Sequence, residues 1–128
     1  MRALLSLFAG CALLGAGILT GLALAGDSPR AAAPPAEPGV KVTFENARVA
    51  VKEIDFPAGA QRAPRTRPTD ELVLFCQEAH YKAVDAQGKS EPRNRAPGAV
   101  VWHKKGELAP TLVNDGGKPI RYYTISVK

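Results

Sequence analysis

The chain has 128 residues and a formal net charge of +5, from 17 Lys and Arg against 12 Asp and Glu. This length accommodates one domain and a targeting segment. The basic residues are scattered, without a long run and without alternation with aromatic residues, so the sequence argues against a nucleic-acid partner. Weak attraction to small anions or to anionic surfaces stays open.

The first 25 residues form an apolar segment whose single charge is Arg2. A positive start, an apolar stretch and small residues at its end are typical of a secretory signal peptide, and Ala23-Leu24-Ala25 has the A-x-A form of a cleavage site. The run is also long enough for an uncleaved membrane anchor, since a span needs ~20 residues. Either way, Arg2 favours a cytoplasmic N-terminus. We therefore expect a periplasmic or extracellular protein, tethered to the membrane only if this segment is retained.

Residues 26–39 follow as a Pro- and Ala-rich linker. This stretch has almost no large apolar side chains to bury, so it is expected to be disordered, and its prolines favour extended conformations. The folded domain is expected over residues 40–128. Cys76 is the only cysteine outside the apolar segment, so no internal disulfide is expected, and its place in an apolar run predicts a buried, inert thiol.

The first half of the domain predicts three strands. Val40, Val42 and Phe44 alternate with polar residues, as in a half-buried strand. A second strand is predicted over residues 47–56, with a change of phase at Lys52-Glu53 that suggests a bulge. Residues 71–77 are apolar on both faces, which predicts a strand covered on both sides.

The second half continues with short strands separated by turns. Strands are predicted at residues 80–84, at AVVWH, at residues 111–113 and at residues 120–127. Asp85–Gly88 and Pro97-Gly98 are predicted turns, and Asn114–Gly117 has the composition of a hairpin turn. Seven or eight short strands at regular spacing predict an all-β sandwich or barrel.

The order of these features resembles the cupin superfamily, and small single-domain bacterial cupins in particular. The first cupin motif has Gly, five residues, His-x-His, three or four residues and Glu; here Gly59 is followed by five residues, Arg65-Thr66-Arg67, three residues and Glu71. Pro97-Gly98 opens AVVWH as PGDVVW opens the second motif, and residues 111–119 resemble the stretch after the last metal-binding His. The resemblance covers residues 44–128 and implies a double-stranded β-helix, or jelly-roll, barrel.

The resemblance also implies a metal site of three His and one Glu, but this sequence departs from it. The two His positions of the first motif hold Arg65 and Arg67, and the last one falls on Ala109 or Pro110, so only Glu71 remains. A guanidinium has no lone pair for a metal. We therefore expect no metal and no cofactor. The alternative is an enzyme of the metallo-cupin oxygenase or isomerase type, with an atypical site rebuilt from His103, Glu71 and His80.

Arg65, Arg67 and Glu71 are separated by even numbers of residues, so an extended chain would direct all three to one face, the barrel interior in a cupin. A guanidinium fork matches a carboxylate or phosphate in bidentate fashion. The leading hypothesis is therefore an exported domain that binds a small anionic ligand between Arg65 and Arg67, with Glu71 orienting them. Trp102, His103 and Asn114 are further candidate ligand-binding residues.

Two other interpretations remain open at this point. Pro64 and Pro68 bracket the arginines, so the segment is equally consistent with a solvated loop that carries surface ion pairs. A structural role is the other: Leu72, Leu74 and Cys76, on the face opposite Glu71, would then pair two copies into a homodimer, or the domain would bind a protein partner.

Overall fold

The computed structural model describes residues 32–128, and the compact unit runs from Ala33 to Lys128. The predicted apolar segment, its cleavage site and the first part of the linker lie outside the described residues. Residues 32–38 have no regular secondary structure. In this part of the chain no helix is long and apolar enough to cross a membrane.

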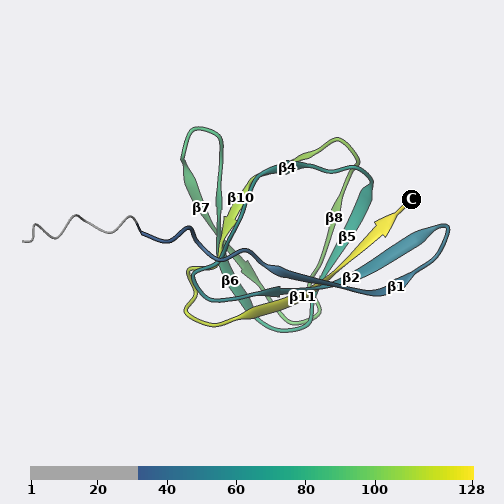
Figure 1. Cartoon of the computed structure of the whole chain (residues 1–128), viewed down its shortest axis with the longest axis horizontal. Coiled ribbons are helices and arrows are strands. Elements are labelled where there is room, and N and C mark those ends of the chain that lie inside the picture. The colour runs from purple at the N-terminus through teal and green to yellow at the C-terminus, as the bar shows by residue number, and fades with distance from the viewer. Residues whose placement is uncertain (1–31) are drawn as a thin grey trace, which may run out of the picture. The chain divides into compact units, whose positions relative to one another are not determined.

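One antiparallel sheet has five strands in the order β1-β2-β11-β5-β8 (Figure 1). These strands are β1 (Gly39–Glu45), β2 (Val49–Phe56), β11 (Ile120–Val127), β5 (Asp70–Phe75) and β8 (Val100–His103). The first and last thirds of the domain thus meet in one sheet, because β11 pairs with both β2 and β5.

A second antiparallel sheet has four strands in the order β3-β10-β6-β7. They are β3 (Gln61–Arg62), β10 (Thr111–Val113), β6 (Ala79–Val84) and β7 (Ser90–Arg95). A short pair, β4 (Arg65–Thr66) with β9 (Leu108–Ala109), connects the two sheets along one side of the barrel (Figure 1).

The core lies between the two sheets and follows from the alternation of side chains along each strand. In β2, Ile54 and Phe56 point inward while Asp55 between them is exposed, and Phe56 is only 1% exposed. Phe75 stacks on Tyr81 of the other sheet with a centroid separation of 6.0 Å. Full burial of a side chain such as Phe56 stabilises the fold by about 1.5–3 kcal/mol.

The all-β class, the barrel and the double-stranded β-helix expected from the sequence are confirmed, and residues 111–113 and 120–127 are strands with the predicted bounds. The bulge predicted at Lys52-Glu53 is wrong. The bulge of this strand pair lies in β1 instead, between Val42 and Phe44. Strand β2 is paired to β11 without interruption, so the edge strand β1 contains the extra residue.

Two further expectations are corrected. Asn114–Gly117 is not a hairpin turn, because β10 and β11 belong to different sheets and the segment crosses between them. Cys76 is exposed rather than buried, because β5 ends at Phe75 and the cysteine begins the turn toward β6.

Strand β7 was not anticipated at all. Its sequence, SEPRNR, has no apolar residue at its inward positions. It is an edge strand that pairs only with β6, which is where Pro92 is tolerated. Arg93 and Arg95 occupy its inward positions and line the interior of the barrel.

Candidate functional site

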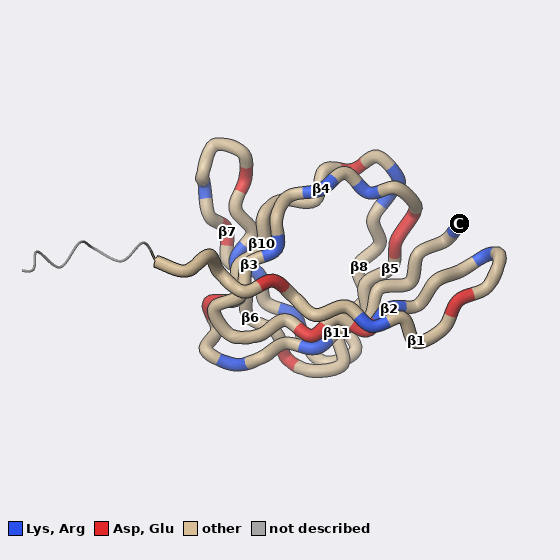
Figure 2. The backbone as a smooth tube through the Cα atoms, in the orientation of Figure 1, with Lys and Arg blue, Asp and Glu red and all other residues tan. Residues whose placement is uncertain are grey.

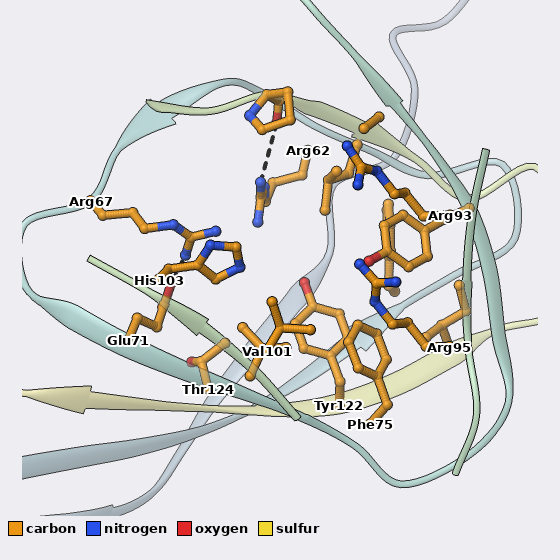
Figure 3. A pocket seen from close by; sticks show the side chains of 17 residues that line it. Arg62, Arg67, Glu71, Phe75, Arg93, Arg95, Val101, His103, Tyr122 and Thr124 are labelled. Carbon is orange, nitrogen blue, oxygen red and sulfur yellow. Dashed lines mark hydrogen bonds and ion pairs between the residues drawn. The ribbon is translucent and has the colours of Figure 1, made fainter. Parts of the chain in front are cut away.

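The interior of the barrel contains a cavity of about 200 Å³ between the two sheets. Its floor is apolar and aromatic, with Phe75, Val101 and Tyr122 among the lining residues (Figure 3). Six of its lining residues are charged or titratable. They are four arginines, one carboxylate and one imidazole: Arg62, Arg67, Arg93, Arg95, Glu71 and His103. Figure 2 shows that basic residues recur on the strands and loops around this interior.

Glu71 is the acidic centre of this group, and two arginines converge on it. Arg65 Nη2 donates to both carboxylate oxygens at 3.0 Å, and Arg67 Nη1 forms an ion pair with Oε2. The Arg65 side chain is 40% exposed, whereas those of Arg67 and Glu71 are each 6% exposed. The expectation of a solvated loop is therefore wrong for Arg67, which is buried and paired with a buried carboxylate.

Backbone pairing fixes where these arginines point. The Arg67 amide donates to the Glu107 carbonyl at 3.0 Å, and its carbonyl accepts from the Gly106 amide at 2.9 Å. This places Arg67 over the cavity just after β4. Arg65 lines a second cavity of about 420 Å³ instead. The two arginines hold one carboxylate from two different cavities, so they do not form a clamp around a shared space.

Three cavity arginines were missed by the sequence analysis: Arg62, Arg93 and Arg95. Arg62 Nη2 donates to the Pro110 carbonyl at 3.2 Å, and Arg95 Nη1 donates to the Asn94 carbonyl at 3.1 Å. Arg93 pairs with Glu91 at 3.0 Å. The signal that could have found Arg93 and Arg95 is their spacing of two residues, which places both on one face of a strand.

Several donors in the cavity have no partner among the described residues. The Nε–H groups of Arg62, Arg67 and Arg95 are buried and find no hydrogen-bond acceptor within residues 32–128. Arg62 and Arg95 also form no ion pair there. The Pro110 and Asn94 carbonyls accept hydrogen bonds from their terminal nitrogens, and Arg62 also interacts with the Tyr122 hydroxyl. Buried polar groups are normally hydrogen-bonded, so these three guanidinium groups leave donors in the cavity that an acceptor could satisfy.

The cavity is electropositive, and its pKa values show it. Burial, with Arg65 and Arg62 nearby, lowers the pKa of Arg67 to about 10, so this guanidinium stays charged at neutral pH. Burial also lowers the pKa of Arg62. The pKa of Tyr122 is raised by its burial in the floor, so its hydroxyl stays protonated.

His103 adds a group that can change its charge. Its Nδ1 lies 3.2 Å from Glu107 Oε2, and because a carboxylate only accepts, Nδ1 carries the proton of the neutral ring. Burial and the neighbouring Arg67 lower the pKa of His103 below its ordinary value of 6.5. The ring is therefore mainly neutral at pH 7, and it takes up a proton only at a lower pH than a free imidazole does.

Two of the candidate residues do not line the cavity. Trp102 is about half exposed on the outer face of β8, because it alternates with Val101 and His103, which point inward. Asn114 is fully buried, and its Nδ2 donates to the carbonyls of Phe56, Pro57 and Lys118. The expectation that both residues line the cavity is corrected: Trp102 lies on a surface and Asn114 holds the backbone.

The residues present do not fit the metal of the cupin motif. Glu71, the one ligand position that keeps its residue type, has both carboxylate oxygens engaged by guanidinium groups. Glu71 and His103 are cross-strand partners, but His80 lies exposed on the other sheet, so the rebuilt site of these three residues does not form. Across residues 32–128 no three His, Cys, Asp or Glu side chains are grouped closely enough to hold a metal ion.

No protein-family model matches the sequence, and no curated protein matches it either. Solved structures do match, among them a cupin domain from Bordetella pertussis Tohama I, with a TM-score of 0.67 and 19% identity over 75% of this chain and 98% of that one. A double-stranded β-helix domain protein from Klebsiella pneumoniae aligns with a TM-score of 0.57 and 18% identity, over 71% of this chain and 76% of that one.

An enzyme is also among these structures. The polyketide cyclase from Streptomyces resistomycificus aligns with a TM-score of 0.55 and 17% identity, over 71% of this chain and 68% of that one. These likenesses establish the fold: residues 33–128 have the fold of a single small cupin domain, which is the fold that the motif order in the sequence predicted.

Proposed function

We propose that this cupin-fold domain binds a small anionic ligand inside its barrel, through the arginine side chains that line the cavity. The observation that carries the proposal is the state of Arg62 and Arg95. Each guanidinium faces the cavity, each has a buried Nε donor without an acceptor in the described chain, and neither has a carboxylate partner there.

The charge balance of the cavity supports an anion over a neutral ligand. Four arginines and one glutamate line the cavity; that glutamate is already shared by Arg65 and Arg67, and Glu91, outside the lining, pairs with Arg93 alone. Burying a charge without a partner is costly, so an arginine-rich interior is stabilised by anything that supplies negative charge. A carboxylate or phosphate does so with two parallel hydrogen bonds per guanidinium, which also fixes its orientation.

In this proposal Glu71 positions the binding groups. Its carboxylate holds Arg67 against the cavity wall, and the bond from Arg65 on the other side holds Glu71 in turn. Arg65 is thus a positioning residue here, not half of a clamp as the spacing in the sequence suggested. A metal-dependent enzyme remains the alternative, and the donor set around Glu71 does not favour it.

The test is a thermal-denaturation series of the purified protein in phosphate, sulfate and small carboxylates at millimolar concentration. An anion at ten times its Kd stabilises the folded state by about 1.4 kcal/mol, which for a domain of this size raises Tm by roughly 5–10 °C. Arg62→Gln and Arg95→Gln should each remove most of that rise. Arg121→Gln is the matched control, because Arg121 lies exposed on the outer face of β11.

If none of these anions raises Tm, or if the Arg62 and Arg95 variants respond as the parent does, the interior is not an anion site. Far-ultraviolet circular dichroism of each variant separates loss of binding from loss of fold.

We also propose that the domain acts outside the cytoplasm, in the periplasm or extracellularly. The support is the N-terminal sequence alone: one positive charge, an apolar stretch and the Ala23-Leu24-Ala25 cleavage form. Expression in a bacterium followed by mass spectrometry of the N-terminus tests it. A mature chain beginning at Gly26, or an intact chain in the membrane fraction, is expected; a full-length chain in the cytoplasm contradicts export.

A further inference from the structure

The positive charge of the cavity is divided between two places in the fold. Arg62 is on β3 and Arg93 and Arg95 are on β7, and these are the two opposite edges of the four-stranded sheet. Two strands lie between them, so the backbones of β3 and β7 are about 14 Å apart at the usual spacing of ~4.8 Å per strand. We call Arg62 with Arg67 the first pole and Arg93 with Arg95 the second pole.

Strand pairing confirms that the second pole faces inward. Arg95 pairs with Ala79 and Arg93 with Tyr81, and both of these β6 residues are buried in the core. Directly paired residues of neighbouring strands point to the same side of a sheet. The exposed Asn94 between the two arginines points the other way.

The first pole combines arginines from two different segments of the barrel wall. Arg67 approaches from the segment after β4, and its side chain and that of Arg62 line the same cavity. The positive charge of Arg62 contributes to the lowered pKa of Arg67. His103, the cross-strand partner of Glu71, lines the same cavity, and the charges of both arginines help to lower its pKa.

Between the poles the lining is apolar. Figure 3 shows Arg67 and His103 entering from one side and Arg93 and Arg95 from the other, with Phe75, Val101 and Tyr122 between them below. Each pole contains a buried Nε donor without an acceptor in the described chain, on Arg67 and Arg62 at the first and on Arg95 at the second. A single small anion satisfies only one of these ends.

We propose that the ligand is a short linear dianion with one anionic group at each end and an apolar middle, such as an aliphatic dicarboxylate. This inference rests on the proposed anion-binding function and specifies its ligand class. One carboxylate lies on Arg62 and Arg67, the other on Arg95 with Arg93 at its side, and the methylene groups lie on the aromatic floor.

The size of the cavity limits the length of the ligand. At about 30 Å³ for each water-sized group, 200 Å³ holds about seven such groups. With each methylene and each carboxylate counted as one such group, saturated dicarboxylates of about four to six carbons fit this space, and fatty dicarboxylates and bulky aromatic acids are disfavoured. The apolar floor disfavours ligands with hydroxyl groups on every central carbon, because those hydroxyls would be buried without partners.

Isothermal titration calorimetry of the purified protein with succinate, glutarate, adipate and suberate, each beside the monocarboxylate of equal chain length, tests the inference. The expected result is an affinity maximum among the shorter dicarboxylates, at least tenfold above the matching monocarboxylate, since charged hydrogen bonds at the second end contribute about that factor. In the double variant Arg93→Gln/Arg95→Gln this preference should vanish, while monocarboxylate affinity changes by less than about threefold.

The outcomes separate the two proposals. Monocarboxylates that bind as tightly as dicarboxylates overturn the dianion inference and leave the anion site in place. A dicarboxylate preference that persists in the double variant overturns the assignment of the second pole. If no carboxylate and no phosphate binds, the proposed function fails together with the inference. Lys89→Gln, in the exposed turn before β7, is the matched control for the loss of charge.

Discussion

The charge of the cavity can be adjusted at a single residue, His103, whose imidazole lies among fixed guanidinium groups. Burial and Arg67 lower its pKa, and Glu107 only partly offsets them. At pH values between that lowered pKa and the ordinary value of 6.5, the His103 ring is mainly protonated in the unfolded chain and mainly neutral in the folded chain. Protonation of His103 therefore costs folding stability, while it adds a donor and a positive charge for an anion.

From this we predict opposite effects of acidification with and without ligand. As pH falls through 6.5, His103 should lower the Tm of the free protein, and the Tm increase caused by a bound anion should grow. His103→Gln should remove both effects. His80→Gln is the control. The hydrogen bond with Asn94 raises the pKa of the exposed His80, so protonation of His80 affects stability in the opposite direction to protonation of His103. Thermal melts from pH 7.5 to 5.5 decide it; an unchanged pH profile in His103→Gln would refute the prediction.

Among single residues, what could be predicted from sequence was limited by partners far along the chain. The even spacing of Arg65, Arg67 and Glu71 correctly grouped the three, because all lie within six residues. It could not show that Arg62 is held by Pro110, 48 residues away, or that Arg65 faces another cavity. Local spacing gives direction along a strand, whereas the wall of a barrel is built from strands distant in sequence.

At the scale of elements, the segment Asn114–Gly117 shows how one residue connects several strands. Asn114 donates to the carbonyls of Phe56 and Pro57 at the end of β2, and its backbone exchanges hydrogen bonds with Gly59 and Ala60. A Cβ on Gly116 would approach the His80 carbonyl oxygen to 2.8 Å, so the chain passes this point only with glycine. The Asn-Asp-Gly-Gly sequence therefore serves a crossover between sheets and not a hairpin.

Asn114→Ala should accordingly lower the free energy of unfolding by about 2–4 kcal/mol, because it removes the amide that donates to three carbonyls and leaves a void in a fully buried position. Urea denaturation followed by circular dichroism measures this. Asn94→Ala, at an exposed position on β7, should change the free energy of unfolding by less than about 0.5 kcal/mol. Equal costs for the two variants would mean that the crossover is not held by the Asn114 amide.

Strand prediction succeeded where one face of a strand is apolar and failed where it is not. Residues 111–113 and 120–127 carry that pattern and were assigned correctly. Residues 90–95 place arginines where apolar side chains would normally point inward, so no period-2 hydrophobic signal exists. The missed strand is the one that carries the second pole, as expected if function replaces core residues at a site.

At the scale of the whole molecule, the outer face of the five-stranded sheet carries a continuous apolar row. Strand pairing places Phe44, Val51, Ile125, Leu72 and Trp102 side by side across all five strands. Phe44 and Trp102 at its two ends are each about half exposed. This row extends the Leu72–Leu74 face for which the sequence suggested pairing, while the exposed Cys76 lies beyond the end of β5.

The homodimer thus stays a prediction, now with a specific surface. A contiguous apolar patch of this kind is typical of an interface, and an isologous contact between two such sheets would bury the row on both partners. Sedimentation velocity should show a dimer, and Ile125→Lys at the centre of the row should yield a folded monomer. Lys89→Glu, in the exposed turn before β7 and away from the row, should stay dimeric. A monomeric parent protein would end this proposal.

The barrel itself was accessible from the sequence because turn residues recur at regular intervals and the motif order resembles cupins. Its closure was not, since β11 completes the sheet by pairing with β2 and β5, about 70 and 50 residues earlier in the chain. The contents of the interior depend on that closure, which is why the fold was predicted better than the site.

The central claim is that the barrel interior holds an anion between its arginines, and a crystal structure with a brominated dicarboxylate, 2-bromosuccinate, tests it most directly. Anomalous scattering locates bromine independently of the fitted chain. We predict a bromine peak inside the cavity, with one carboxylate on Arg62 and Arg67 and the other toward Arg95. Bromine found only on the outer surface, with the interior arginines contacting water alone, would contradict the claim.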